Sequence, residues 1–332
     1  MDKLNFNRKS IVLFLGLALL LALPPLAISI DEAYFISLFS RILIYALAAV
    51  SLDLILGYAG MASLGHGAFI GIGAYSVGIF AFHLTEGTVI PFLPGEWAGS
   101  INALFVWTSA IIASSFFALI IGALSLRTSG VYFIMITLAF SQMLFFFFVS
   151  LNTYGGEDGV NLEQRNQVRG LDLSNDAIFY YTCLTLLLAL VYICLRIVNS
   201  RFGMVMRGCK QNEIRMRALG YSTYRYKLIC FVIAGAGAGL AGALLANQSE
   251  FVSPGLMHWT RSGEVMIMVI LGGMGTIFGP IFGAVGLLLM EEILSTYTEH
   301  WMIILGPVLI CVVLFARRGI YGFLSGDEGR DG

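Results

Sequence analysis

Six polar side chains stand inside long apolar stretches of the sequence, where a hydrocarbon environment makes them costly. They are Ser63, His66, Tyr75, Tyr132, Thr137 and Gln142. Polar groups within a membrane are tolerated chiefly where they line a path for a solute or bond to another helix. We therefore predict that these residues line a translocation path, with a hydrogen bond between helices as the alternative for each of them.

Motifs for catalysis or cofactor binding are missing from the sequence. The four lysines are Lys3, Lys9, Lys210 and Lys227, and none ends a GxxxxGK[ST] phosphate-binding loop. The histidines are scattered and no HExxH motif occurs, so no metal site is expected. We predict that the chain is not an enzyme and binds no cofactor or metal. Any ATP on which it depends would be hydrolysed by a partner.

The string Gly237–Gly242 fits the GxGxxG pattern of dinucleotide sites. That pattern requires a preceding strand and a βαβ unit, whereas here it lies in an apolar stretch. Small residues spaced four apart, such as Gly235 and Gly239, let membrane helices approach closely. We interpret the string as a helix-packing face.

The composition predicts an all-α integral membrane protein. Of 332 residues, 58% are hydrophobic and 12% are charged, against about 25% charged in soluble domains. Uncharged runs such as 54–85, 97–126 and 228–249 can cross the hydrocarbon core as helices, which takes about 20 residues. We predict about eight full spans plus broken or shorter segments, or about 8–10 transmembrane helices. The net charge of −1 gives no field that would attract nucleic acid.

Basic residues orient these spans. Eight of the nineteen Lys and Arg residues fall between Arg196 and Lys227, and such residues concentrate in cytoplasmic loops. The predicted organisation is a cytoplasmic tail with a first helix (1–32), a membrane domain (33–320) that contains the cytoplasmic loop 196–227, and a C-terminal tail (321–332). Both termini are expected in the cytoplasm. The alternative for residues 11–30 is a cleaved signal peptide.

Two glycine-rich stretches interrupt the apolar pattern, one in each half of the chain. Their glycines are Gly57, Gly60 and Gly65 in the first, and Gly272, Gly273, Gly275 and Gly279 in the second. The charge pattern requires residues 262–292 to cross twice or to enter and turn back, and the second stretch supplies the turn. Two such broken segments predict an inverted repeat. The alternative is packing of small residues between helices.

A short amphipathic segment lies within the basic loop. Residues 211–219 predict a helix that ends at Gly220, because glycine favours the left-handed conformation that follows many helices. A helix this short is marginal alone in water, so we expect it to dock on a cytoplasmic partner. The alternative is a basic helix on the membrane surface.

Several motifs resemble, in order, those of the LivM-type permease family of branched-chain amino-acid ABC importers. They are Gly57-Tyr58-Ala59-Gly60 with Ser63 to Phe69, Gly130 to Phe140, Gly155 to Gly159, Ser200-Arg201-Phe202-Gly203, Ala218-Leu219-Gly220, and Val269 to Thr276 with Gly279-Pro280. The resemblance covers about residues 45–320. It implies that 33–320 is the permease domain of an importer in the bacterial inner membrane.

The resemblance also implies partners and a coupling surface. A second homologous permease would complete the pore, two cytoplasmic ATPase subunits would supply energy, and a periplasmic binding protein would deliver the substrate. The ATPase contact would be made by Gln211, Asn212, Glu213, Arg217, Ala218 and Gly220. Gln211 stands where such permeases often carry an acid, which leaves Glu213 as the one acidic contact.

Two other functions stay open at this point. A permease for urea or short-chain amides shares the glycine-rich motifs of the family. An ion-coupled secondary transporter would need titratable groups at mid-membrane, and the sequence offers almost none beyond His66.

Overall fold

The computed structural model describes residues 8–29, 32–90, 99–168, 170–297, 300, 303, 306–307, 310 and 319–325. Within these residues helices dominate, and the named strands are a two-residue pair, β1 (Val160–Asn161) and β2 (Phe251–Val252). The prediction of an all-α membrane protein is confirmed. Most of residues 298–318, and the part of the predicted C-terminal tail beyond residue 325, lie outside the described residues.

Seven of the described helices are long and apolar enough to cross a membrane. They are α2 (Ala33–Asp53, continued by the π-helical turn η1, Leu54–Tyr58), α3 (His66–Thr85), α4 (Ala103–Ser125), α5 (Val131–Val149), α6 (Asp176–Val198), α9 (Thr223–Ser249) and α11 (Gly279–Tyr297). The other helical elements are α1 (Arg8–Ser29), α7 (Arg201–Gln211), α8 (Glu213–Ala218), α10 (Trp259–Gly272), α13 (Gly319–Ser325) and the 3-10 turns η2 (Asn152–Tyr154) and η3 (Pro254–Met257).

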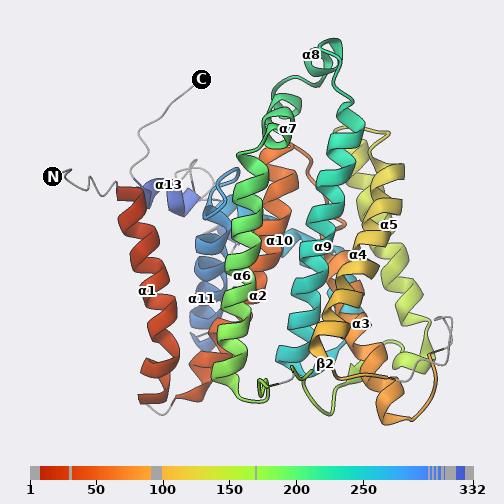
Figure 1. Cartoon of the computed structure of the whole chain (residues 1–332), viewed down its shortest axis with the longest axis vertical. Coiled ribbons are helices and arrows are strands. Elements are labelled where there is room, and N and C mark those ends of the chain that lie inside the picture. Colours follow the sequence, from red (N-terminus) through yellow and green to blue (C-terminus); the bar gives the residue numbers. More distant parts are fainter. Residues whose placement is uncertain are drawn as a thin grey trace.

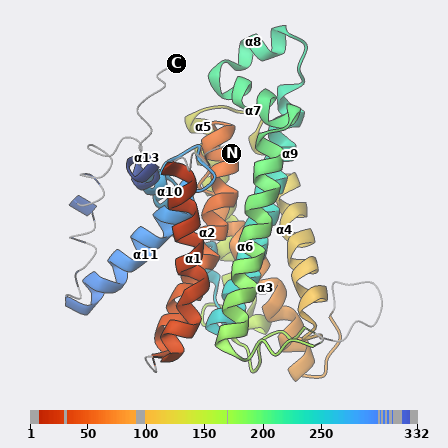
Figure 2. The same cartoon turned by 60° about the vertical axis from the view of Figure 1, so that its left-hand side comes forward.

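The long helices run between two ends of the molecule, which we call the α8 end and the strand end. At the α8 end, α7 and α8 project beyond the other helices (Figure 1), and the second view shows the same projection (Figure 2). At the strand end, β1 pairs antiparallel with β2, with Val160 opposite Val252. The segment between α5 and α6 and the segment between α9 and α10 therefore meet at one end, and the basic loop 196–227 forms the other.

Helix α9 packs at the centre of the fold against α2, α3 and α4. The contact depends on glycines that bring backbones together. A Cβ atom at Gly239 would collide with Ser114 on α4, and one at Gly242 would collide with the carbonyl oxygen of Ile70 on α3. The interpretation of the GxGxxG string as a helix-packing face is confirmed.

Residues 262–292 turn back on themselves, because α10 and α11 are joined by a turn at residues 273–278. Of these two helices, α11 is among the seven that are long and apolar enough to cross a membrane, and α10 is not. The turn lies at the α8 end, where it lines a cavity with Lys210 and Gln211 of α7. With 14 residues, α10 is about 21 Å long, which is short for a span. The chain enters α10 through the 3-10 turn η3, whose Pro254 and Met257 are buried, and irregular backbone is tolerated in a membrane where protein buries it.

A second irregular segment, residues 59–65, turns back into the layer before α3 begins. The backbone N–H of Leu64 donates to Oγ1 of Thr137, at 3.3 Å. Thr137 lies seven residues beyond Gly130 at the α8 end, a rise of about 10 Å along α5. Helix α3 therefore starts inside the layer, and His66 at its first turn is fully buried.

Candidate functional site

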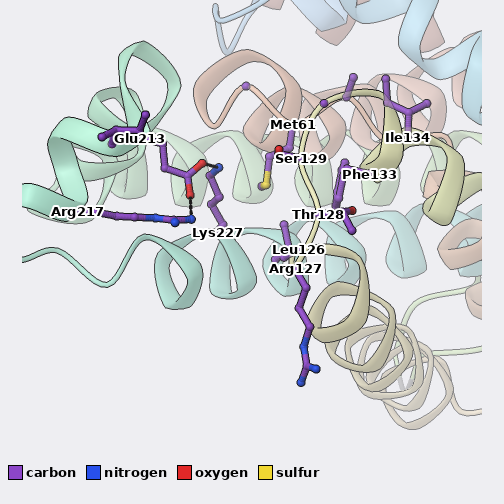
Figure 3. Close-up of a pocket in the computed structure, with 14 residues that line it drawn as sticks. Met61, Leu126, Arg127, Thr128, Ser129, Phe133, Ile134, Glu213, Arg217 and Lys227 are labelled. Atoms are coloured by element: carbon purple, nitrogen blue, oxygen red, sulfur yellow. Dashed lines mark hydrogen bonds and ion pairs between the residues drawn. The ribbon is translucent and has the colours of Figure 1, made fainter.

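A cavity of about 450 Å³ lies at the α8 end between α8, the α4–α5 loop and the first glycine break. Its lining residues are Gly60, Met61, Ala62, Leu126, Arg127, Thr128, Ser129, Gly130, Phe133, Ile134, Glu213, Ile214, Arg217 and Lys227. Figure 3 shows Glu213 on one side of this cavity, turned toward Arg217 and Lys227. The cavity thus brings the basic loop and the glycine break together.

Glu213 is held by three side chains of its own chain. Its Oε1 atom accepts from Nη2 of Arg217 at 2.5 Å and from Oγ1 of Thr223 at 3.2 Å. Its Oε2 atom accepts from Nζ of Lys227 at the start of α9. Burial raises the pKa of the Glu213 carboxyl, but the hydrogen bonds and charges of Lys227 and Arg217 outweigh it and lower that pKa overall. The network ties α8 to α9.

The loop helix differs from the single helix predicted over 211–219. Gln211 ends α7, and Asn212 is extended, with φ −158° and ψ 98°. The Asn212 Oδ1 atom accepts from the backbone N–H of Arg215 at 2.9 Å and so caps a separate helix, α8. The capping asparagine is the physical reason for the break, and α8 is left with six residues.

The predicted end of this helix at Gly220 is confirmed. Gly220 has φ +87°, its N–H donates to the carbonyl oxygen of Arg217 at 3.0 Å, and the N–H of Tyr221 donates to that of Met216 at 3.1 Å. This is the Schellman arrangement. Ala218 is the last residue of α8, and the helix has no buried residue. Ile214 is 82% exposed, although it is apolar.

Behind α8, helix α7 contacts the first glycine break directly. Nζ of Lys210 donates to the carbonyl oxygen of Gly57 at 2.6 Å. Gly60 has φ +70°, and a Cβ atom there would lie 2.9 Å from Cγ of Lys210. The Lys210 side chain therefore packs on the backbone at Gly60, which adopts a left-handed conformation that favours glycine.

The two glycine breaks are joined to each other. Oδ1 of Asp53 accepts from the N–H of Gly275 at 2.8 Å. A Cβ atom at Gly57 would lie 2.5 Å from the same Gly275 nitrogen, so the two backbones touch. In the second break, a Cβ atom at Gly272 would collide with the carbonyl oxygen of Gly279, which lets α10 and α11 approach closely. A chain of contacts thus runs from α7 through both breaks.

Three of the predicted path residues lie near one another at the start of α3. Oγ of Ser63 accepts from the N–H of Gly65 at 3.2 Å, and Thr137 accepts from Leu64 as described above. Nε2 of His66 lies 2.8 Å from Oγ of Ser51. These contacts bind an irregular backbone segment to α2 and α5.

The other three path residues do not join this group. Tyr75 is buried, with its ring 4.3 Å from that of Phe148. Gln142 has a buried Nε2 atom without a hydrogen-bond partner among the described residues. Tyr132 is 75% exposed on α5. Whether any of the six contacts a solute stays a prediction.

Reasoning from the sequence gave too little weight to three residues. Asp53 sits near the end of an apolar run, where an acidic residue can also face interfacial water. Lys210 is one of eight basic residues in the loop 196–227, and its position there does not distinguish it from the others. Arg41 was not singled out, although a charge within the apolar stretch 34–56 is itself a signal of a functional position.

Comparison with known proteins agrees with this architecture. The family described as "Branched-chain amino acid transport system / permease component" matches residues 34–313. The LivM permease protein of the high-affinity branched-chain amino acid transport system of Escherichia coli (strain K12) is 28% identical over 306 residues, which cover 84% of this chain and 68% of the relative. The Salmonella typhimurium LivM protein is 28% identical over 305 residues, with the same coverage.

A second permease of such systems also matches, over a shorter region. The LivH permease protein of Escherichia coli (strain K12) is 31% identical over 137 residues, or 41% of this chain and 44% of LivH. No solved structure gives a significant match. The helical membrane fold, the glycine breaks and the match over residues 34–313 lead to one conclusion: the chain belongs to the family of branched-chain amino acid transport permeases of ABC transporters.

Proposed function

We propose that the chain is one of two pore-forming permease subunits of an ATP-driven importer of branched-chain amino acids. The observation that carries the proposal is the contact chain from α7, which Asn212 joins directly to α8, to both glycine breaks. Glu213 links α8 to α9, Lys210 links α7 to Gly57, and Asp53 links the first break to Gly275. A displacement of α7 and α8 would therefore reach the irregular backbone inside the layer.

The exposed surface of α8 supports contact with a partner. Ile214 and Leu219 are 82% and 66% exposed, next to Arg215 and Arg217. The loop 196–227 is the most basic loop of the chain, so in this proposal it lies in the cytoplasm. Both termini are placed in the cytoplasm as well. In this proposal α8 docks on a cytoplasmic ATPase subunit, while a periplasmic binding protein meets the strand end in the bacterial inner membrane.

ATP can drive transport only if its binding stabilises one state of the pore relative to the other. Closure of two ATPase subunits would push α8 and, through Lys210 and Asp53, shift the two breaks together. The second permease is expected because the chain is similar both to LivM over most of its length and to LivH over a shorter region.

The test is uptake by the complex of this chain with its second permease, two ATPases and binding protein, reconstituted in liposomes. We expect ATP-dependent uptake of labelled leucine and no uptake of urea.

A variant tests the coupling role of α8. Glu213→Arg replaces a hydrogen-bond acceptor of the network by a positive charge that repels Lys227. It should leave membrane insertion intact and lower the ratio of leucine transported to ATP hydrolysed. Arg201→Glu, a charge reversal at an exposed position at the start of α7 and outside α8, is the control. Equal ratios in both variants would refute the coupling role of α8.

A further inference from the structure

Four charged side chains lie at membrane depth between α2, α10 and α11. Nη2 of Arg41 lies 3.7 Å from Oε1 of Glu291, and Nη1 of Arg261 lies 2.8 Å from Oε2 of Glu264. Arg41 precedes Asp53 by twelve residues on α2, a rise of about 18 Å. It follows Ala33, the first residue of that helix, by eight residues, a rise of about 12 Å, in a layer about 30 Å thick. Charged groups at such depth face a water-filled path or a protein surface rather than lipid.

A cavity of about 380 Å³ lies beside these charges, next to β2. Arg41 and Arg261 line it from opposite helices, together with the polar groups of Tyr45, Gln248 and Ser253. Apolar side chains complete the wall: Leu245, Phe251 and Leu256. Small-molecule sites combine an apolar wall with a few polar groups in volumes of about 300–1,000 Å³.

The two guanidinium groups retain most of their hydrogen-bonding capacity. The side chain of Arg41 makes no hydrogen bond to a described residue. It has an ion pair to Glu291 and lies 5.8 Å from the centre of the Tyr45 ring. Arg261 donates one hydrogen bond from its side chain to a described residue, Glu264. Each guanidinium has five N–H donors in a fork that fits a carboxylate. Their side chains are 36% and 37% exposed, so a solute can reach them.

We propose that this cavity is a binding site for the substrate on the strand side of the permease. Arg41 and Arg261 hold the α-carboxylate of the amino acid, and Glu264 and Glu291 lie close enough to those arginines to attract its ammonium group. The aliphatic side chain rests on the apolar wall. The site rests on the proposed function, because it takes the transported solute to be a branched-chain amino acid.

The test is protection of a cysteine placed in the cavity of the assembled complex. The four described native cysteines are buried, and Cys311 would be replaced by serine to remove any background labelling. Ser253→Cys then reports on the cavity through its reaction rate with N-ethylmaleimide, a neutral reagent. Ser174→Cys, in the exposed loop at the same end, is the matched control.

We expect millimolar leucine to slow the labelling of Ser253→Cys and not that of Ser174→Cys. Leucinol, which lacks the carboxylate, should not protect. With Arg261→Gln, protection should need about tenfold more leucine, since a charged hydrogen bond contributes roughly that factor, and Arg261→Lys should restore part of it. If Ser253→Cys does not assemble, the same shifts are expected in the KM for leucine uptake.

The outcomes separate this site from the proposed function. Leucine uptake by the complex without leucine protection of Ser253→Cys would overturn the site and leave the importer assignment standing. Protection without leucine uptake would overturn the importer assignment and keep the site. A cysteine that stays unreactive with and without leucine would mean that a partner subunit covers this face, which also overturns the site.

Discussion

The carboxylate of Asp53 accepts a 2.8 Å hydrogen bond from the backbone N–H of Gly275, 222 residues further along the chain. Asp53 is 1% exposed, at the point where α2 changes into the π-helical turn η1. Gly275 has φ +81° in the turn between α10 and α11. One hydrogen bond therefore fixes the two broken segments of the permease against each other.

Two replacements of Asp53 distinguish the loss of its hydrogen-bond acceptor from the loss of its charge alone. Asp53→Leu leaves the Gly275 N–H buried without a partner, which costs about 1–3 kcal/mol. Asp53→Asn keeps an oxygen acceptor and should cost less. The measurement is the thermal unfolding midpoint of the purified permease in detergent. An Asp53→Leu midpoint equal to that of the original chain would show that this hydrogen bond does not stabilise the fold.

The Glu213 network predicts a defined pH dependence for α8. Because the folded pKa of Glu213 is lowered from 4.5, the stabilisation of the network is complete above that pH. It is lost as the pH falls below 4.5 through the folded pKa. Hydrogen exchange of the amides of residues 213–218, corrected for intrinsic rates, checks this. In Glu213→Gln the amides should exchange faster without the acidic transition, and persistence of that transition would assign it to another group.

Ile214 predicts where the ATPase docks. Ile214→Glu places a charge on the exposed apolar surface of α8 without disturbing a buried contact, so the permease should fold normally and lose the ATPase during copurification. Leu171→Glu, at a position 50% exposed in the loop near the strand end, is the matched control and should keep it. Equal ATPase recovery from both variants would contradict docking on α8.

Because α9 lies very close to α4 at Gly239, we expect a larger side chain at this position to destabilise the fold. Gly239→Leu forces α9 away from Ser114 and Ala110 of α4, and overpacking of this kind typically costs about 1–3 kcal/mol or more. Gly263→Leu adds the same side chain where no atom lies within 4 Å. The yield of monodisperse protein and its unfolding midpoint should fall in the first variant only. A similar fall in both would trace the effect to the leucine itself.

Much of the fold could be predicted from the sequence, because each membrane-spanning helix corresponds to one continuous apolar run. Uncharged runs of sufficient length mark helices such as α4 and α9, and the Gly272–Gly279 stretch marks the turn between α10 and α11. The end of α8 before Gly220 could also be predicted, because glycine adopts the left-handed conformation that follows many helices more readily than other residues.

The site was less predictable, because its contacts join distant positions. Nothing local shows that Asp53 would meet Gly275, or that Lys210 would lie over Gly57. Glu213 was predicted to contact an ATPase, and the structure adds that its oxygens accept hydrogen bonds from Arg217, one turn further along α8, and from Lys227 on the adjoining helix α9. The break at Asn212 was not predicted, although asparagine is a preferred N-cap residue whose side chain competes with helix continuation.

The most direct test of the account is labelled leucine uptake by the reconstituted complex, measured with and without ATP and with a proton gradient as the only alternative energy source. The account predicts uptake that requires ATP and ignores the gradient. Uptake driven by the gradient alone, or uptake of urea in place of leucine, would contradict it.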